Sequence, residues 1–130
     1  MVKEAKLWQE QAESDFEDAK LLWDNHRYGA AVLFYQQSVE KLIKAYIVSH
    51  KNLAPKKTHR IEDLLKEADL NVVHIEETTG IKIEELSKAY IRVRYPDLNK
   101  QYFRSRDKAT KFVILGEQLY IWIKKQFRKR

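Results

Sequence analysis

Hydrophobic residues recur every three or four positions in five stretches of the chain, with charged and amide side chains between them. This spacing is typical of amphipathic helices. It predicts helices over residues 3–25, 28–50, 58–68, 83–95 and 105–127. The second of these has no proline and no glycine after its first turn, so we expect a long helix that is largely buried.

Polar residues separate the first three predicted helices. Residues 25–27 form a short polar turn, and residues 51–57 form a loop that contains a proline. Thr58 follows this loop and precedes two acidic residues, which makes it the expected N-cap of the third helix.

A proline sets the expected end of the fourth helix. Pro96 disfavours helical geometry in the residue before it, so this helix is predicted to end at Arg94 and Tyr95. Residues 97–104 are then expected to be an exposed connection. No regular structure is predicted for residues 69–81, where Thr-Thr-Gly is the clearest break.

These elements predict an all-α protein, an antiparallel up-and-down bundle of four to five helices. A chain of 130 residues can bury a core of its own and has the usual length of one domain, so residues 1–130 are expected to form a single domain. The absence of cysteine excludes a disulfide framework, a thiol nucleophile and a thiolate metal site. No apolar run is like a signal peptide or long enough for a bilayer, so we expect a cytoplasmic protein without a membrane partner.

The net charge of +6 is unevenly distributed along the chain. Residues 1–25 have a net charge of −4, residues 26–97 of +2 and residues 98–130 of +8. The basic last helix either faces the acidic first helix, with its final cations complementing the helix dipole, or forms a nucleic-acid surface. The first reading is favoured because few aromatic residues are interleaved with these cations as stacking platforms.

Several catalytic classes have no counterpart in the sequence. Three glycines provide neither a Gly-rich dinucleotide turn nor a P-loop. The four histidines are far apart, without the spacing of helix-borne metal ligands, and no serine lies in a nucleophile elbow. We therefore expect no metal, no cofactor and no complete catalytic constellation.

A polar stripe runs along the second predicted helix, opposite its apolar face. It consists of Gln36, Gln37, Glu40, Lys41 and Lys44, with Leu33 among them. The apolar neighbours leave two readings open: a binding site, or an exposed face on which Glu40 and Lys44 form an ordinary ion pair four residues apart.

Two further features carry charge in unusual places. Asp15 lies inside the apolar arc of the first helix, where it is either buried against a cation, with Lys44, His59 and Arg94 as candidates, or reaches solvent at the boundary. In residues 90–97 two arginines meet aromatic residues and an acid at a helix end. Arginine forks suit phosphate or carboxylate, but cations also stabilise a helix C-terminus.

Taken in order, these segments resemble the HEPN family, the "higher eukaryotes and prokaryotes nucleotide-binding" helical domain. The residues that carry the resemblance are Trp8, Ala12, Asp15 and Ala19; Tyr28 and residues 36–46; residues 57–61 with Leu64 and Leu65; and Tyr90 with residues 94–97. The resemblance implies a helical bundle, homodimerisation and pairing with a minimal nucleotidyltransferase protein, as in toxin–antitoxin systems.

The resemblance also implies two activities. Some members are proposed to bind a nucleotide in a polar groove, whereas others are metal-independent ribonucleases that use an arginine, four to six residues and then a histidine. That spacing precedes none of the four histidines, and Arg94 is followed by Tyr95, Pro96 and Asp97. Cleavage by 2′-hydroxyl attack needs a proton acceptor beside the arginine, so catalysis is not expected.

Our hypothesis is a non-catalytic module that binds a nucleotide or another phosphate-bearing ligand. The site residues would be Lys44, Arg94, His59, Tyr90 and Tyr95, with Asp15, Gln37, Glu40 and Asp97 as supporting polar groups. Lys44 and Arg94 would contact phosphate, and either tyrosine would stack. The alternatives are a dimer or partner interface without a small ligand, and an atypical ribonuclease; RNA binding without cleavage is a weaker variant.

Overall fold

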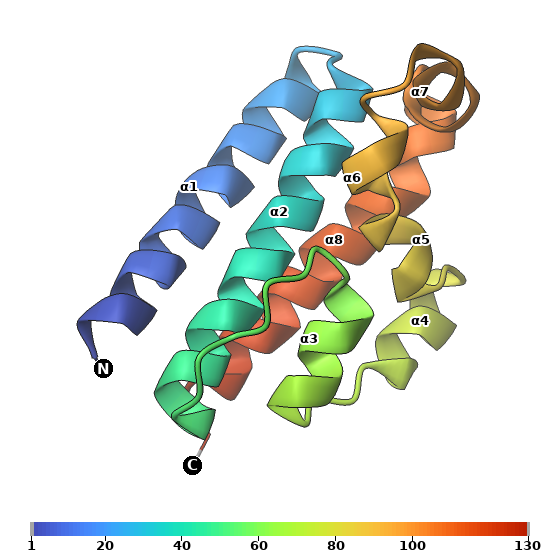
Figure 1. Ribbon diagram of the computed structural model, residues 1–130. Helices are drawn as coiled ribbons and strands as arrows, with labels where there is room; N and C mark the ends of the chain where they lie inside the picture. The colour runs from blue at the N-terminus through green and yellow to red at the C-terminus, as the bar shows by residue number, and fades with distance from the viewer. Residues whose placement is uncertain (1, 130) are drawn as a thin grey trace.

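The computed structural model describes residues 2–129, and in this range the backbone forms helices and no strand. Three long helices are α1 (Lys3–Asp24), α2 (Tyr28–Tyr46) and α8 (Arg106–Gln126). Figure 1 shows α1 and α2 side by side and antiparallel, whereas α8 lies behind α2 and runs in the same general direction. The all-α prediction is confirmed for the described residues.

Shorter helices pack against α2 and α8 on the side away from α1 (Figure 1). They are α3 (Ile61–Ala68), α4 (Val73–Thr79), α5 (Ile83–Ser87), α6 (Ala89–Arg92) and α7 (Pro96–Phe103), and a π-helical turn, η1 (Ile47–Lys51), extends α2. The structure therefore has more helices than the four to five that the sequence predicts.

Two of these helices replace segments that were expected to be irregular. Helix α7 stands where the sequence analysis predicted an exposed connection, and that prediction is wrong. Pro96 occupies the first turn of α7, where its missing N–H is not needed, whereas the preceding helix α6 already ends at Arg92 and not at the predicted Arg94 and Tyr95. Helix α4 forms within residues 69–81, with Ile75 buried.

The third and fourth predicted helices also differ in their bounds. The fourth is divided at Lys88 into α5 and α6. The third begins at Ile61, so Thr58 is not its N-cap; the Thr58 hydroxyl accepts from the Arg60 N–H at 3.1 Å instead. The Ile61 N–H donates to Ser87 Oγ at 2.9 Å, which joins the start of α3 to the end of α5.

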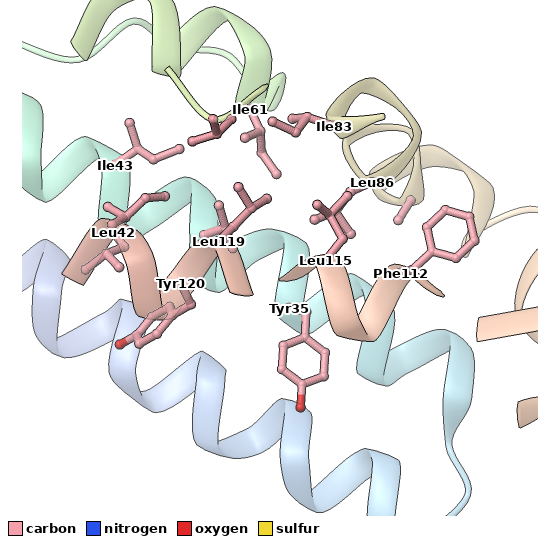
Figure 2. Packing of buried hydrophobic residues seen from close by; sticks show 14 of the residues in the cluster. Tyr35, Leu42, Ile43, Ile61, Ile83, Leu86, Phe112, Leu115, Leu119 and Tyr120 are labelled. Carbon is pink, nitrogen blue, oxygen red and sulfur yellow. The ribbon is translucent and has the colours of Figure 1, made fainter. Parts of the chain in front are cut away.

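The core lies where α2 and α8 pack against each other and against the short helices. Figure 2 shows Leu42, Leu115 and Leu119 between these elements, with Ile61 above them and Leu86 beside Leu115. Each fully buried leucine or isoleucine contributes roughly 1.5–3 kcal/mol relative to an exposed one. Among residues 2–129 no helix is both long and apolar enough to cross a membrane.

Candidate functional site

The buried carboxylate of Glu40 is the centre of a polar cluster on α2. Its side chain is 6% exposed. Glu40 Oε1 accepts from Gln36 Nε2 at 3.1 Å and from His59 Nδ1 at 3.1 Å, and Oε2 accepts from Lys44 Nζ at 3.2 Å. A buried carboxylate needs such partners, because removal from water costs several kcal/mol unless charge and hydrogen bonds compensate it.

The helix geometry of α2 explains how three members of this cluster come together. Gln36, Glu40 and Lys44 follow one another at four-residue spacing, which places them on one face of the helix. The Gln36 amide also donates from Nε2 to the carbonyl oxygen of His59 at 3.1 Å. Helix α2 therefore holds the loop before α3 at two points, the His59 backbone and the His59 ring.

The hydrogen bond to Glu40 fixes the tautomer of His59. A carboxylate oxygen only accepts, so Nδ1 carries the proton in this bond. The side chain is 51% exposed, and Nε2 makes no hydrogen bond with any of residues 2–129. This second ring nitrogen is thus available to a ligand.

The rings of His59 and Tyr90 and the guanidinium of Arg94 form a stacked column. The two ring centroids are 3.7 Å apart and 14° from parallel. The guanidinium carbon of Arg94 lies 4.0 Å from the Tyr90 centroid, and Arg94 Nη1 donates to the Tyr90 carbonyl. The His59 ring and the Arg94 guanidinium are too close to the Tyr90 ring to lie on the same face of it. They therefore cover its two opposite faces. A base that stacks on Tyr90 would have to displace one of them.

Lys44 lies deeper than a residue that contacts ligand directly. Its side chain is 10% exposed, and its ammonium is 5.2 Å from the centroid of the Trp8 ring in addition to its ion pair with Glu40. The positive charge of Lys44 is therefore largely compensated by Glu40 within the cluster. Arg94, by contrast, is exposed and has guanidinium N–H groups beyond the one that bonds to Tyr90.

Asp15 is paired with a cation that the sequence analysis did not consider for it. Lys41 Nζ lies 2.6 Å from Asp15 Oδ2, with side chains 23% and 14% exposed. The expected partners Lys44, His59 and Arg94 were wrong. The pair joins α2 to α1, because the long stem of Lys41 reaches across from a position that the helical wheel assigned to the polar side.

The remaining predicted residues lie apart from the cluster. Tyr95 is 58% exposed and directly precedes α7, while Asp97 is exposed in the first turn of that helix. Gln37 is half-buried on α2. Within residues 2–129, no hydrogen bond or ion pair joins these three side chains to Glu40, His59 or Arg94. Gln36, which the sequence analysis placed in the stripe but not in the site, takes part instead.

The arrangement has two chemical properties. Its outer edge presents the Arg94 guanidinium, which suits an anionic oxygen, and the Nε2 atom of His59, a hydrogen-bond acceptor that suits a hydroxyl or amino group. Its inner part is a Glu–His pair in which the carboxylate orients the imidazole, and such a pair can also accept a proton.

Three comparisons place the chain among known proteins. The family model for the HEPN domain matches residues 5–126. "Putative toxin MJ1304" of Methanocaldococcus jannaschii is 32% identical over 107 residues, which cover 74% of this chain and 66% of that protein, just under two thirds of its length. The crystal structure of TT1696 from Thermus thermophilus superposes with a TM-score of 0.76 at 24% identity, covering 96% of this chain and 99% of that one. The last likeness concerns the fold alone.

Proposed function

Because the chain belongs to the HEPN domain family, we propose that it binds a phosphate-bearing ligand, such as a nucleotide, at the outer edge of the His59–Tyr90–Arg94 column. The observation that supports this most is the exposed Arg94 guanidinium, oriented by its stack on Tyr90 and its bond to the Tyr90 carbonyl. A fixed guanidinium binds phosphate at a lower entropic cost than a mobile one.

The other residues have distinct proposed roles. Nε2 of His59 accepts a hydrogen bond from a hydroxyl group of the ligand, and Glu40 and Gln36 hold the His59 ring in place. Lys44 compensates the charge of Glu40 and supports the column without touching the ligand. Tyr95 offers a stacking face, because its ring is exposed whereas that of Tyr90 is covered.

We further propose that the protein acts in a toxin–antitoxin-like pair with a minimal nucleotidyltransferase, and as a homodimer. The family and the name of the M. jannaschii relative support the pair. Expression of this chain in cells should change growth, and co-expression of the partner should reverse the change. Unchanged growth in both cultures would contradict the pairing.

The ligand proposal is tested by thermal shift with adenine and guanine nucleotides, with pyrophosphate and high salt as comparisons. A ligand at about a hundred times its Kd adds roughly 2.7 kcal/mol of stability. We expect a shift that one base gives, that survives salt and that pyrophosphate does not reproduce.

The matched variants for this test are Arg94→Ala and Arg104→Ala, since both residues are exposed arginines near the ends of short helices. Arg94→Ala should abolish the shift, and Arg104→Ala should retain it. A wild-type shift in Arg94→Ala would exclude the column as the site.

A second candidate function is supported by the Glu40–His59 hydrogen bond. An oriented imidazole beside an arginine can take the 2′-hydroxyl proton of RNA, even though the family's ribonuclease spacing is missing. Purified protein in chelator would then cleave a mixed RNA, and His59→Ala would not. No cleavage at micromolar protein would end this candidate.

A further inference from the structure

A cavity of about 380 Å³ lies between α1 and the end of α8, and its walls contain no residue of the His59–Tyr90–Arg94 column. Volumes of this size accommodate small organic ligands. Its floor is apolar: the rings of Phe16 and Tyr120 stack with centroids 4.0 Å apart and planes 10° from parallel. Ile121 lies at the rim and is 50% exposed.

The hydroxyl of Tyr120 is an unused polar group in this floor. The residue is 3% exposed, and its oxygen has no hydrogen-bond partner among residues 2–129. Figure 2 shows the hydroxyl pointing toward α1. Burial, with smaller effects of Glu13 and Glu17, raises the pKa of Tyr120 to about 12, so the hydroxyl is neutral at physiological pH and can donate or accept. Buried polar groups without partners are rare, because they lose their hydrogen bonds to water without compensation.

The charges around the cavity are divided between its two walls. Helix α1 contributes Glu13 and Glu17, whereas the end of α8 and the residues after it contribute Lys124, Lys125 and Arg128. None of these five side chains forms an ion pair with another group in the described part of the chain. A sixth charge, the ammonium of Lys20, also lies on the α1 wall, 4.5 Å from the Phe16 ring centroid, so this wall has two carboxylates and one cation.

The separation of carboxylates from most of the cations restricts which ligands the cavity can bind. A simple anion would be attracted to one wall and repelled by the carboxylates of the other, and a simple cation would meet the reverse arrangement. A molecule that carries both charges at a short separation is attracted to both walls. An apolar group on the same molecule would lie against the exposed Ile121 side chain, beside the buried Phe16 and Tyr120 rings.

We propose that this cavity binds a small zwitterion with an apolar group, the chemistry of a free α-amino acid with an apolar side chain. The ammonium faces Glu13 and Glu17, and the carboxylate faces Lys124 and Arg128. The Tyr120 hydroxyl, which points toward α1, accepts a hydrogen bond from the ligand ammonium. The site is separate from the column and does not depend on nucleotide binding.

Isothermal titration calorimetry with four probes tests the charge requirement. L-Phenylalanine and L-leucine carry both charges, phenethylamine lacks the carboxylate, and 3-phenylpropionate lacks the ammonium. We expect both amino acids to bind, with L-phenylalanine about tenfold or more tighter than either analogue, since each hydrogen-bonded charge contributes on this scale. Equal affinity of the three aromatic probes, or no heat from either amino acid, would overturn the proposal.

Variants test the position of the site. Tyr120→Phe removes only the unpartnered hydroxyl, so it should leave the melting temperature of the free protein unchanged or raise it, yet weaken L-phenylalanine binding. Tyr102→Phe, a half-buried tyrosine outside the cavity, is the matched control and should bind as the wild type does. Arg128→Gln should weaken L-phenylalanine and 3-phenylpropionate but not phenethylamine. Unchanged affinity in Tyr120→Phe and in Arg128→Gln would overturn the proposal.

Discussion

Glu40, Glu85 and Glu117 are three glutamates in different surroundings, and each affects stability in its own way. Glu40 accepts three hydrogen bonds in the buried cluster. The hydrogen bond from Lys88, followed by that from Arg92, lowers the pKa of Glu85. Burial raises the pKa of Glu117, and the charge of Lys20 only partly offsets this effect. The neighbours of Glu85 thus favour its charged form, whereas the surroundings of Glu117 favour its neutral form.

The pKa of Glu117 predicts a stabilising substitution. As the pH rises above 4.5, the ordinary pKa of a glutamate, Glu117 loses its proton in the unfolded chain before it does so in the folded protein. The folded state then binds more protons than the unfolded state. The free energy of unfolding therefore falls as the pH rises through the folded pKa. Glu117→Gln removes this loss. Its melting temperature should exceed that of the wild type at pH 7 by about 1–2 °C, since water still screens the half-buried side chain, and the difference should shrink at pH 4.

Glu85→Gln is the control variant, for which we expect the opposite change in melting temperature. Because its folded pKa is lowered, the ionised side chain stabilises the fold above pH 4.5, and this contribution is lost as the pH falls through the folded pKa. The variant should melt below the wild type at pH 7. Melting curves of both variants at the two pH values check the pair, and a drop in Glu117→Gln at pH 7 would refute the first prediction.

At the scale of single residues, the sequence predicts on which face of a helix a residue lies, but not which group a long side chain reaches. Four-residue spacing correctly placed Glu40 beside Lys44, because helix geometry fixes that pairing. The pair of Asp15 with Lys41 depends on the rotamer of a lysine that crosses to another helix. The position of His59 depends on a loop, and loop geometry leaves no periodic pattern in the sequence.

At the scale of elements, long helices and short ones differ in how well the sequence predicts them. Helices α1, α2 and α8 contain 22, 19 and 21 residues, enough turns for an apolar period to repeat. Helices α4 and α7 contain 7 and 8 residues, about two turns each, and their stability depends on packing that no local pattern reveals. This is why both were missed.

The contact between α2 and α8 depends on one small residue. A Cβ atom added at Gly116 would lie 2.8 Å from Tyr35 Cβ, which is fixed to the backbone of α2. Gly116→Ala should therefore push the helices apart and lower the free energy of unfolding by about 1–3 kcal/mol. The better helix propensity of alanine, about 1 kcal/mol, offsets only part of this.

Urea unfolding measures the effect, with Gly29→Ala as the control. At Gly29 the nearest group is the Asn99 side chain, which can move, so the loss there should be smaller. A Gly116→Ala variant as stable as the wild type would mean that α8 can shift without cost.

At the scale of the whole molecule, charge is separated between the two ends of the sequence. Residues 1–25 have a net charge of −4 and residues 98–130 of +8. The cavity brings charged residues of both segments together, since Glu13 and Glu17 face Lys124, Lys125 and Arg128 across it. None of these side chains forms an ion pair within residues 2–129. The cations at the end of α8 are exposed, so they remain available to a polyanion on the surface outside the cavity.

We predict that these cations, and not the column, govern binding to single-stranded RNA of arbitrary sequence. Binding should weaken steeply with salt, and neutralising Lys124, Lys125 and Arg128 with glutamine should reduce the slope of log K against log salt by about 2. Fluorescence anisotropy at several salt concentrations measures this slope. The control variant neutralises Lys57, Lys66 and Lys82, three exposed cations elsewhere, and an equal reduction there would show that only net charge matters.

The sharing of one carboxylate by three donors also has an evolutionary consequence. Replacing Glu40 alone leaves the buried ammonium of Lys44 without compensation, and replacing Lys44 alone leaves a buried carboxylate with only neutral donors or a charged imidazole. Single changes at positions 36, 40, 44 and 59 should thus be selected against, while paired changes are tolerated. As lineages diverge, these four positions should covary, with acid and lysine lost together from α2.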